Sequence, residues 1–250
     1  MAGFWGRRFG NMKIHICTKE QAAQRAAERY VQLLREKPNA VLGFATGSTP
    51  LQLYAELVRR YQAGDVSFRN TTTFNLDEYV GLDGENTESY RYFMDTHLFS
   101  KIDVPKGNTH VPSGIGCTDA SVTVYDDLIA AAGGIDLQLL GVGRNGHIGF
   151  NEPGTPFGSI THIVNLSRST REANARFFNS VDDVPRQAVS MGIKTVMNAR
   201  AILFFAQGEK KAQVVHDALC GPVTEDVPAS VLQLHPDVEL YLDFDAAKLL

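Results

Sequence analysis

Short apolar runs alternate with amphipathic helical patterns along the chain, and this alternation is the strongest constraint on its fold. Six runs have the composition of buried strands: Lys13–Cys17, Ala40–Ala45, Thr72–Leu76, Asp136–Leu140, Ala201–Phe205 and Val238–Phe244. Apolar residues at helical spacing lie between them, at Lys19–Glu36, Pro50–Tyr61, Val122–Ala132 and Lys210–Leu219. Strands joined by helices form right-handed crossovers, so the sequence predicts an α/β fold of three layers, with a mainly parallel, twisted, Rossmann-like sheet between helices.

The length indicates one domain. A chain of 250 residues that is 44% hydrophobic can bury a full core without a second domain. The first strand-like run begins directly after Met12, so we expect residues 1–11 to be a non-native or disordered extension. Residues 12–250 are expected to form a single catalytic domain, in which the segment 161–185 is a candidate lid.

Charge and cysteine usage exclude several classes of protein. The net charge is −4 and the charges are interspersed, which argues against nucleic-acid partners and membrane surfaces. No stretch approaches the roughly 18 apolar residues that a membrane span needs. Cys17, Cys117 and Cys220 lie far apart, and no metal-ligand spacing occurs, so we expect a cytoplasmic protein without a metal site.

Residues suited to ligand binding and catalysis are concentrated in the segment Gly141–Pro153. It combines four glycines, His147 and Glu152 directly after a predicted strand. Gly141, Gly143 and Gly146 match the dinucleotide-binding fingerprint. That fingerprint requires that a helix begin directly after the glycines and that an Asp or Glu follow about 20 residues later. Glycine and proline interrupt any helix here, and residues 160–170 contain no Asp or Glu. A pair of His147 and Glu152 suits general acid and base chemistry.

Further polar segments follow other predicted strands, and in parallel sheets such segments meet at one edge. Thr46–Pro50 precedes a helix, with Ser48 or Thr49 available as N-cap, so it is either an anion site or a plain cap. Asp77 is either a general base or a turn acid, and the sequence leaves open whether it or Glu78 points inward. Local cations available to a phosphate are Arg168, Arg171, Arg176, Lys210 and Lys211.

Four motifs together resemble the glucosamine-6-phosphate deaminase family. They are Ala45–Pro50, Asn75–Leu82, Gly143–Pro153 and Asn174–Phe178, and the likeness extends from about Met12 to the C-terminus. The resemblance implies conversion of glucosamine 6-phosphate and water to fructose 6-phosphate and ammonia without a metal or organic cofactor. It implies that Asp77 transfers the proton between C2 and C1, and that His147 opens the sugar ring with Glu152 and Asn145 orienting it. The phosphate would be bound by Gly47, Ser48, Thr49, Arg176 and Lys211.

Some positions depart from the family pattern. Asn145 stands where some members carry Asp, so it can only orient or hydrogen-bond. His162 and Val164 stand where activated hexameric relatives carry a basic pair, which favours an unregulated monomer or small homo-oligomer. Two alternatives share the expected fold, a 6-phosphogluconolactonase and a sugar-phosphate-sensing domain of a transcription regulator. The Leu76–Tyr79 motif and the residues after His147 favour the deaminase, and no basic helix-turn-helix precedes the first site loop.

Overall fold

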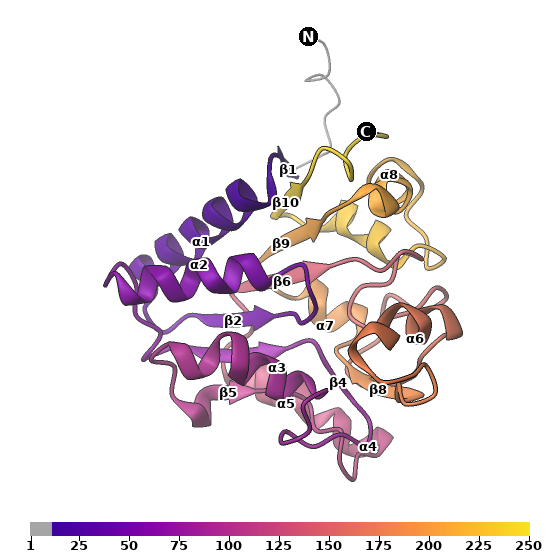
Figure 1. The fold of residues 1–250 in the computed structure, drawn as a ribbon, viewed down its shortest axis with the longest axis horizontal. Coiled ribbons are helices and arrows are strands. Elements are labelled where there is room, and N and C mark those ends of the chain that lie inside the picture. Colours follow the sequence, from indigo (N-terminus) through magenta and orange to yellow (C-terminus); the bar gives the residue numbers. More distant parts are fainter. Residues whose placement is uncertain (1–11) are drawn as a thin grey trace.

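A seven-stranded parallel sheet forms the centre of the molecule (Figure 1). The computed structural model describes residues 12–250, and the expectation for residues 1–11 lies outside the described residues. Every neighbouring pair of strands in this sheet is parallel. In spatial order the strands are β1 (Lys13–Ile16), β10 (Val238–Leu242), β9 (Ala201–Ala206), β6 (Leu137–Gly141), β2 (Val41–Phe44), β3 (Thr72–Asn75) and β5 (Thr109–His110).

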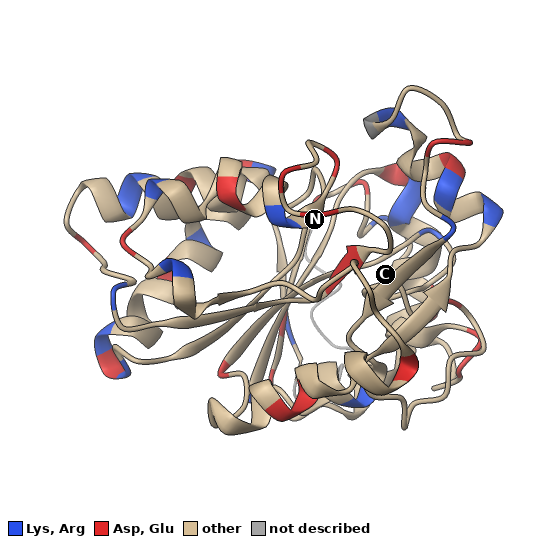
Figure 2. Cartoon of the chain, turned by 90° about the horizontal axis from the view of Figure 1, so that it is seen from below, with Lys and Arg blue, Asp and Glu red and all other residues tan. Residues whose placement is uncertain are grey.

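Helices cover both faces of this sheet, as the edge-on view in Figure 2 shows. On one face, Phe44 of β2 packs against Tyr30 of α1 (Lys19–Glu36) and Tyr54 of α2 (Leu51–Gln62). On the other, Phe74 of β3 packs against Tyr125 of α5 (Val124–Ala131). The remaining helices are α3 (Tyr90–His97), α4 (Asp119–Val122), α6 (Arg168–Asn174), α7 (Ile193–Met197) and α8 (Ala212–Cys220).

The predicted three-layer α/β fold is confirmed, and all six strand runs and four helical patterns occur with ends shifted by at most two residues. The prediction works because strands buried on both faces must be apolar throughout, as β9 is. α1 begins at the predicted residue because Thr18 and Gln21 form a reciprocal capping box. Within residues 12–250, no helix is long and apolar enough to cross a bilayer.

The sequence did not predict β5, the helices α3, α4, α6 and α7, or a second, three-stranded antiparallel sheet. The second sheet consists of β4 (Asp77–Tyr79), β8 (Gln187–Ser190) and β7 (His162–Asn165). The segment Asp77–Tyr79, expected to be a polar segment after a strand, is itself a strand. The small sheet has its own apolar cluster of Tyr79, Phe150, Val164, Leu166, Val184 and Ala188.

The chain passes from the large sheet to the small sheet at Leu76. The Leu76 amide donates to the carbonyl of Phe44 in β2, and its carbonyl accepts the amide of Met191, just after β8. Asp77, the next residue, therefore lies at the seam between the two sheets. This position places its carboxyl beside the ends of the parallel strands, where α/β proteins bind ligands.

Candidate active site

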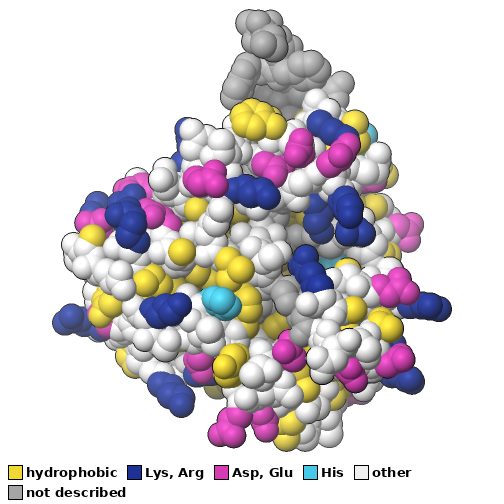
Figure 3. Space-filling model, in the orientation of Figure 1, with side chains coloured by type: hydrophobic (Ala, Val, Ile, Leu, Met, Phe, Trp, Pro, Cys, Tyr) yellow, Lys and Arg dark blue, Asp and Glu magenta, His cyan; other side chains and the backbone are white. Residues whose placement is uncertain are grey.

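A cavity of about 1270 Å³ opens at the carboxyl ends of the parallel strands. Its walls come from the segments that follow β2, β3, β6 and β9, and from the region of α6. Figure 3 shows this face of the molecule hollowed near its middle, with Lys and Arg side chains gathered beside the hollow. The segments that follow these strands therefore line one cavity, as the sequence predicted.

The segment after β2 forms one end of the cavity, where Gly47, Ser48 and Thr49 line the wall. Gly47 has φ of +100°, a conformation that glycine adopts at little cost. The expectation that Ser48 or Thr49 caps the following helix is wrong, because Pro50 is the N-cap of α2 and no side chain caps it. The first amides of α2 thus receive no side-chain acceptor, and the segment keeps the features of an anion site.

Two cations line the same end of the cavity. Arg176 donates to the Ser48 hydroxyl at 3.2 Å, and the Lys211 ammonium donates to the carbonyl of Val142 at 2.6 Å. Burial, together with the charges of Arg144 and Arg176, lowers the pKa of Lys211 to about 8. Crowded positive charges that weaken one another's protonation are suited to a multiply charged anion such as phosphate.

The other candidate cations have different roles. Arg168 pairs with Glu172 at 2.8 Å in an exposed ion pair one helical turn apart. Arg171 donates to the carbonyls of Val181 and Val184 and so holds the chain that follows α6. Lys210 lines the cavity beside Lys211. Neither Arg168 nor Arg171 lines the cavity, so the structure separates them from Arg176 and Lys211.

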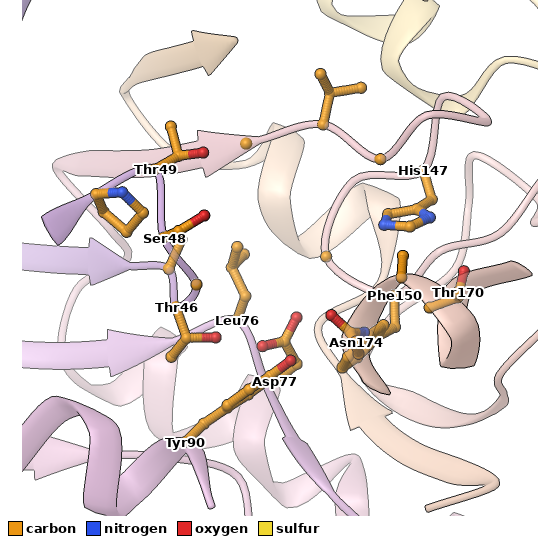
Figure 4. A pocket seen from close by; sticks show the side chains of 18 of the residues that line it. Thr46, Ser48, Thr49, Leu76, Asp77, Tyr90, His147, Phe150, Thr170 and Asn174 are labelled. Atoms are coloured by element: carbon orange, nitrogen blue, oxygen red, sulfur yellow. The ribbon is translucent and has the colours of Figure 1, made fainter. Parts of the chain in front are cut away.

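Asp77 presents its carboxyl to the middle of the cavity (Figure 4). The residue is only 6% exposed, and its side chain receives no hydrogen bond from the described residues 12–250. Burial, and next the charge of Glu78, raise the pKa of Asp77 to about 8. A carboxyl with a pKa this close to neutrality can accept and return a proton, which an ordinary ionised Asp does poorly.

Glu78 points away from the cavity and caps a helix. Its Oε1 accepts the amides of Tyr79 and Tyr90, and its Oε2 accepts the amide of Arg91 at 2.9 Å. These bonds fix the start of α3, together with the Ser89 hydroxyl, which accepts the Tyr92 amide. The structure thus settles which of the two acids faces the cavity. Glu78 holds α3 in place, while Asp77 remains available for chemistry.

The His147 imidazole lies flat against the backbone of Gly143. A Cβ at position 143 would lie within 2.4 Å of three ring atoms of His147, so only glycine fits there. No helix occurs between β6 and β7, which agrees with the rejection of a dinucleotide fold. Figure 4 shows the ring and the Asp77 carboxyl facing the same open space.

Glu152 lies behind His147 rather than in the cavity wall. Its Oε2 accepts the Asn145 amide at 2.5 Å and is 3.8 Å from His147 Nδ1, which is buried and has no hydrogen-bond partner in the described structure. Burial acts to raise the pKa of Glu152, but the His147 imidazole, the Thr170 hydroxyl and the Asn145 amide lower it to about 2. The carboxylate is therefore ionised and faces an imidazole that it can orient.

The sequence did not identify several residues that shape the cavity. Tyr90 of α3 lines it, and its ring stacks at 6.0 Å on Phe150 while its hydroxyl donates to that of Tyr79. Thr170 lines it as well. The only sequence signal for Tyr90 was the serine before it, a helix N-cap at the start of an amphipathic segment. Among residues 12–250, no three His, Cys, Asp or Glu side chains are grouped to hold a metal ion.

The parallel sheet, the anion end and the acid–base groups define a class of enzyme that acts on phosphorylated sugars. The chain belongs to the family of glucosamine-6-phosphate isomerases and 6-phosphogluconolactonases, whose family model matches residues 17–241. It is 51% identical over 237 residues, 94% of each chain, to glucosamine-6-phosphate deaminase from Geobacillus sp. (strain WCH70).

Solved structures give the same picture. A monomeric glucosamine-6-phosphate deaminase superposes with a TM-score of 0.93 at 46% identity, covering 96% of this chain and all of that one. A 6-phosphogluconolactonase from Trypanosoma cruzi superposes with a TM-score of 0.78 at 19% identity, covering 95% of this chain and 96% of the other. The second likeness shows a common fold alone.

Proposed function

We propose that this protein is a glucosamine-6-phosphate deaminase that converts glucosamine 6-phosphate and water to fructose 6-phosphate and ammonia. The observation that carries the proposal is the arrangement of Asp77 and His147 around one cavity whose end holds Ser48, Arg176 and Lys211. The similarity to deaminases over nearly the whole chain supports it. We propose no metal or organic cofactor, since proton transfers by these side chains and attack by water are sufficient for the reaction.

The phosphate of the substrate binds between Gly47, Ser48 and Thr49 on one side and Arg176 and Lys211 on the other. Arg176 already contacts Ser48, so the phosphate oxygens enter an arrangement of donors that exists without them. Binding energy from this remote group then positions the reacting carbons beside Asp77.

In this proposal, His147 catalyses ring opening. The imidazole takes the proton of the C1 hydroxyl and delivers it to the ring oxygen, so the bond between C1 and the ring oxygen breaks and an aldehyde forms. Glu152 and Asn145 hold the imidazole in the orientation that this transfer requires.

Asp77 then removes the proton from C2 while the aldehyde oxygen takes a proton from the substrate ammonium, which gives an enolamine, and Asp77 returns its proton to C1. The resulting C2 iminium is hydrolysed by water to the ketone and ammonia. A base with a pKa near 8 suits this step, because it is basic enough to take a carbon-bound proton and still releases it again. A lactone hydrolase requires no base for a carbon-bound proton, so Asp77 favours the deaminase over the lactonase alternative.

The proposal includes the organisation of the chain. Residues 12–250 act as one catalytic domain, and the segment 161–185 moves as a lid, since α6 and η3 (Ala175–Phe177) lie in it beside the cavity. The residues His162–Asn165 of this segment are paired in the small sheet and anchor its start. We propose a monomer, following the monomeric solved relative, and a cytoplasmic location, in keeping with free Cys17, Cys117 and Cys220.

The test is ammonia release by the purified protein from glucosamine 6-phosphate, with and without N-acetylglucosamine 6-phosphate. We expect release in both cases without activation. Asp77→Asn is expected to abolish turnover while sugar-phosphate binding persists, whereas a wild-type protein that releases no ammonia refutes the proposal. His147→Gln should lose more activity on the cyclic substrate than on an open-chain analogue, and equal losses contradict its role in ring opening.

A further inference from the structure

The carboxylate of Glu152 is held from two sides, and one of these sides belongs to α6. Its Oε1 accepts the Thr170 hydroxyl at 2.5 Å and the Ser167 hydroxyl at 3.1 Å. Its Oε2 accepts the Asn145 amide, which comes from the loop that carries His147. Each oxygen therefore has donors from a different segment, and rotation of the carboxylate breaks hydrogen bonds on both sides.

Thr170 makes the shorter of the two contacts from α6 and is itself buried, with 4% of its surface exposed. Ser167 is the N-cap of α6, and its hydroxyl accepts the Thr170 amide at 3.2 Å. The same hydroxyl oxygen lies 3.0 Å from the Thr170 hydroxyl oxygen, and its single proton is shared between this contact and the one to Glu152. Thr170 is thus fixed in backbone and side chain, which suits a group that has to hold another in place.

The position of Glu152 matters because His147 depends on it. The imidazole Nδ1 is buried, has no hydrogen-bond partner in the described structure and lies 3.8 Å from Glu152 Oε2. A carboxylate at this distance is close enough to stabilise an imidazolium, and a small displacement changes the interaction strongly in a partly dry site. The group that fixes Oε1 therefore sets the distance between Oε2 and the imidazole.

α6 also reaches the other end of the cavity. The helix continues through η3, where Arg176 contacts Ser48 of the anion end, and Ser169, Ala173 and Asn174 line the wall between. Figure 4 shows Thr170 and Asn174 on the side of the cavity that carries His147. One short segment thus contacts both the phosphate end and the carboxylate behind the imidazole.

We propose that Thr170 is a positioning residue for ring opening, whose hydroxyl fixes Glu152 opposite His147 and links that pair to the segment that carries Arg176. This inference rests on the proposed function. Thr170 touches no reacting atom in this scheme and acts through Glu152. Its role differs from that of the anion-end residues, since its loss affects the chemical step rather than the binding of the phosphate.

The test uses two substitutions that separate the hydroxyl from the shape of the side chain. Thr170→Val keeps the shape and removes the donor, while Thr170→Ser keeps the donor and removes a methyl group. We expect Thr170→Val to lower kcat by about tenfold, the loss expected for one hydrogen bond to a charged group, with KM changed by less than about twofold. Thr170→Ser should recover most of kcat.

A matched control lies on another part of the fold. The Thr195 hydroxyl of α7 donates to Asp126 of α5, another partly buried contact between a threonine and a carboxylate, and neither residue lines the cavity. Thr195→Val should leave kcat and KM as they are. Equal losses in Thr195→Val and Thr170→Val mean that general loosening of the fold explains the effect, and they overturn the proposal.

Ring opening itself can be isolated in an Asp77→Asn background, where proton transfer at carbon is blocked. The readout is the exchange between the α and β anomers of glucosamine 6-phosphate, measured by NMR saturation transfer. We expect added Thr170→Val to slow the exchange that the protein catalyses, and added Thr170→Ser to retain it. Undiminished exchange with Thr170→Val overturns the inference. Wild-type protein that releases no ammonia overturns the proposed function instead, so the two failures are distinguishable.

Discussion

Replacing Asp77 by Asn should stabilise the protein, and the gain should grow with pH. Because the pKa of Asp77 is raised to about 8, the folded protein keeps this carboxyl protonated at pH values where the unfolded chain, with a pKa of about 3.9, has lost the proton. Between these two values the folded state binds more protons than the unfolded state, so stability falls as pH rises. Asn carries no proton to lose, and the variant lacks this decline.

The size of the expected stability difference follows from the one additional proton that the folded state binds. The slope is about 1.4 kcal/mol per pH unit, so the gap in unfolding free energy between variant and wild type should widen by about 2 to 3 kcal/mol from pH 5 to pH 7. Above pH 8 the widening should stop, because Asp77 is then ionised in both states. The measurement is urea unfolding of both proteins at pH 5, 6, 7 and 8.5, with stabilities extrapolated to water.

Glu152→Gln provides a control of opposite sign. The pKa of Glu152 is lowered to about 2, so its contribution to stability is fully present above the unfolded value of about 4.3 and is lost only as pH falls through the folded value. The difference in unfolding free energy between Glu152→Gln and wild type should therefore stay constant from pH 5 to pH 8.5. Parallel stability curves for Asp77→Asn and wild type over this range would refute the argument that burial raises the pKa of Asp77.

Three further predictions concern activity and the core. kcat/KM should rise about tenfold per pH unit below pH 8 as Asp77 ionises and fall above pH 8 as Lys211 loses its proton, and a flat profile of initial ammonia release from pH 5.5 to 10 contradicts this. Lys211→Met should raise KM for the sugar phosphate about tenfold or more, and an unchanged KM removes Lys211 from phosphate binding. Phe204→Ala, in fully buried β9, should cost about 3 to 5 kcal/mol in urea unfolding, and a loss under about 1 kcal/mol contradicts its place in the core.

The large sheet was predictable because its strands are apolar and are separated by helices with clear periodicity. β9 reads Ala-Ile-Leu-Phe-Phe-Ala, a run that only a strand buried on both faces explains at this length. The small sheet was not, because β4 reads Asp-Glu-Tyr and β7 reads His-Ile-Val-Asn. Such short, polar strands form because neighbouring strands and the Tyr79 and Phe150 cluster hold them, and a local pattern does not record those partners.

Part of the candidate site was likewise predictable from the sequence, and part was not. The positions of segments after parallel strands predicted that Asp77 and His147 share a cavity, and the family resemblance added Arg176. The inward direction of Asp77 rather than Glu78 depends on the amides of α3, a helix that comes from further along the chain. Thr170 was missed for the same reason, because its partner is 18 residues away and a lone threonine carries no motif.

The seam at Leu76 has a consequence for how the parts of the site can move. Asp77 begins β4, and the loop after His147 is tied to β8, where the Ser190 hydroxyl accepts the Phe150 amide and the Met191 carbonyl accepts the Asn151 side chain. Asp77 and the residues just after His147 are thus bonded to the small sheet, while Ser48 follows β2 of the large one. A rotation of one sheet against the other would therefore change the distance between the Asp77 carboxyl and the Ser48 end of the cavity.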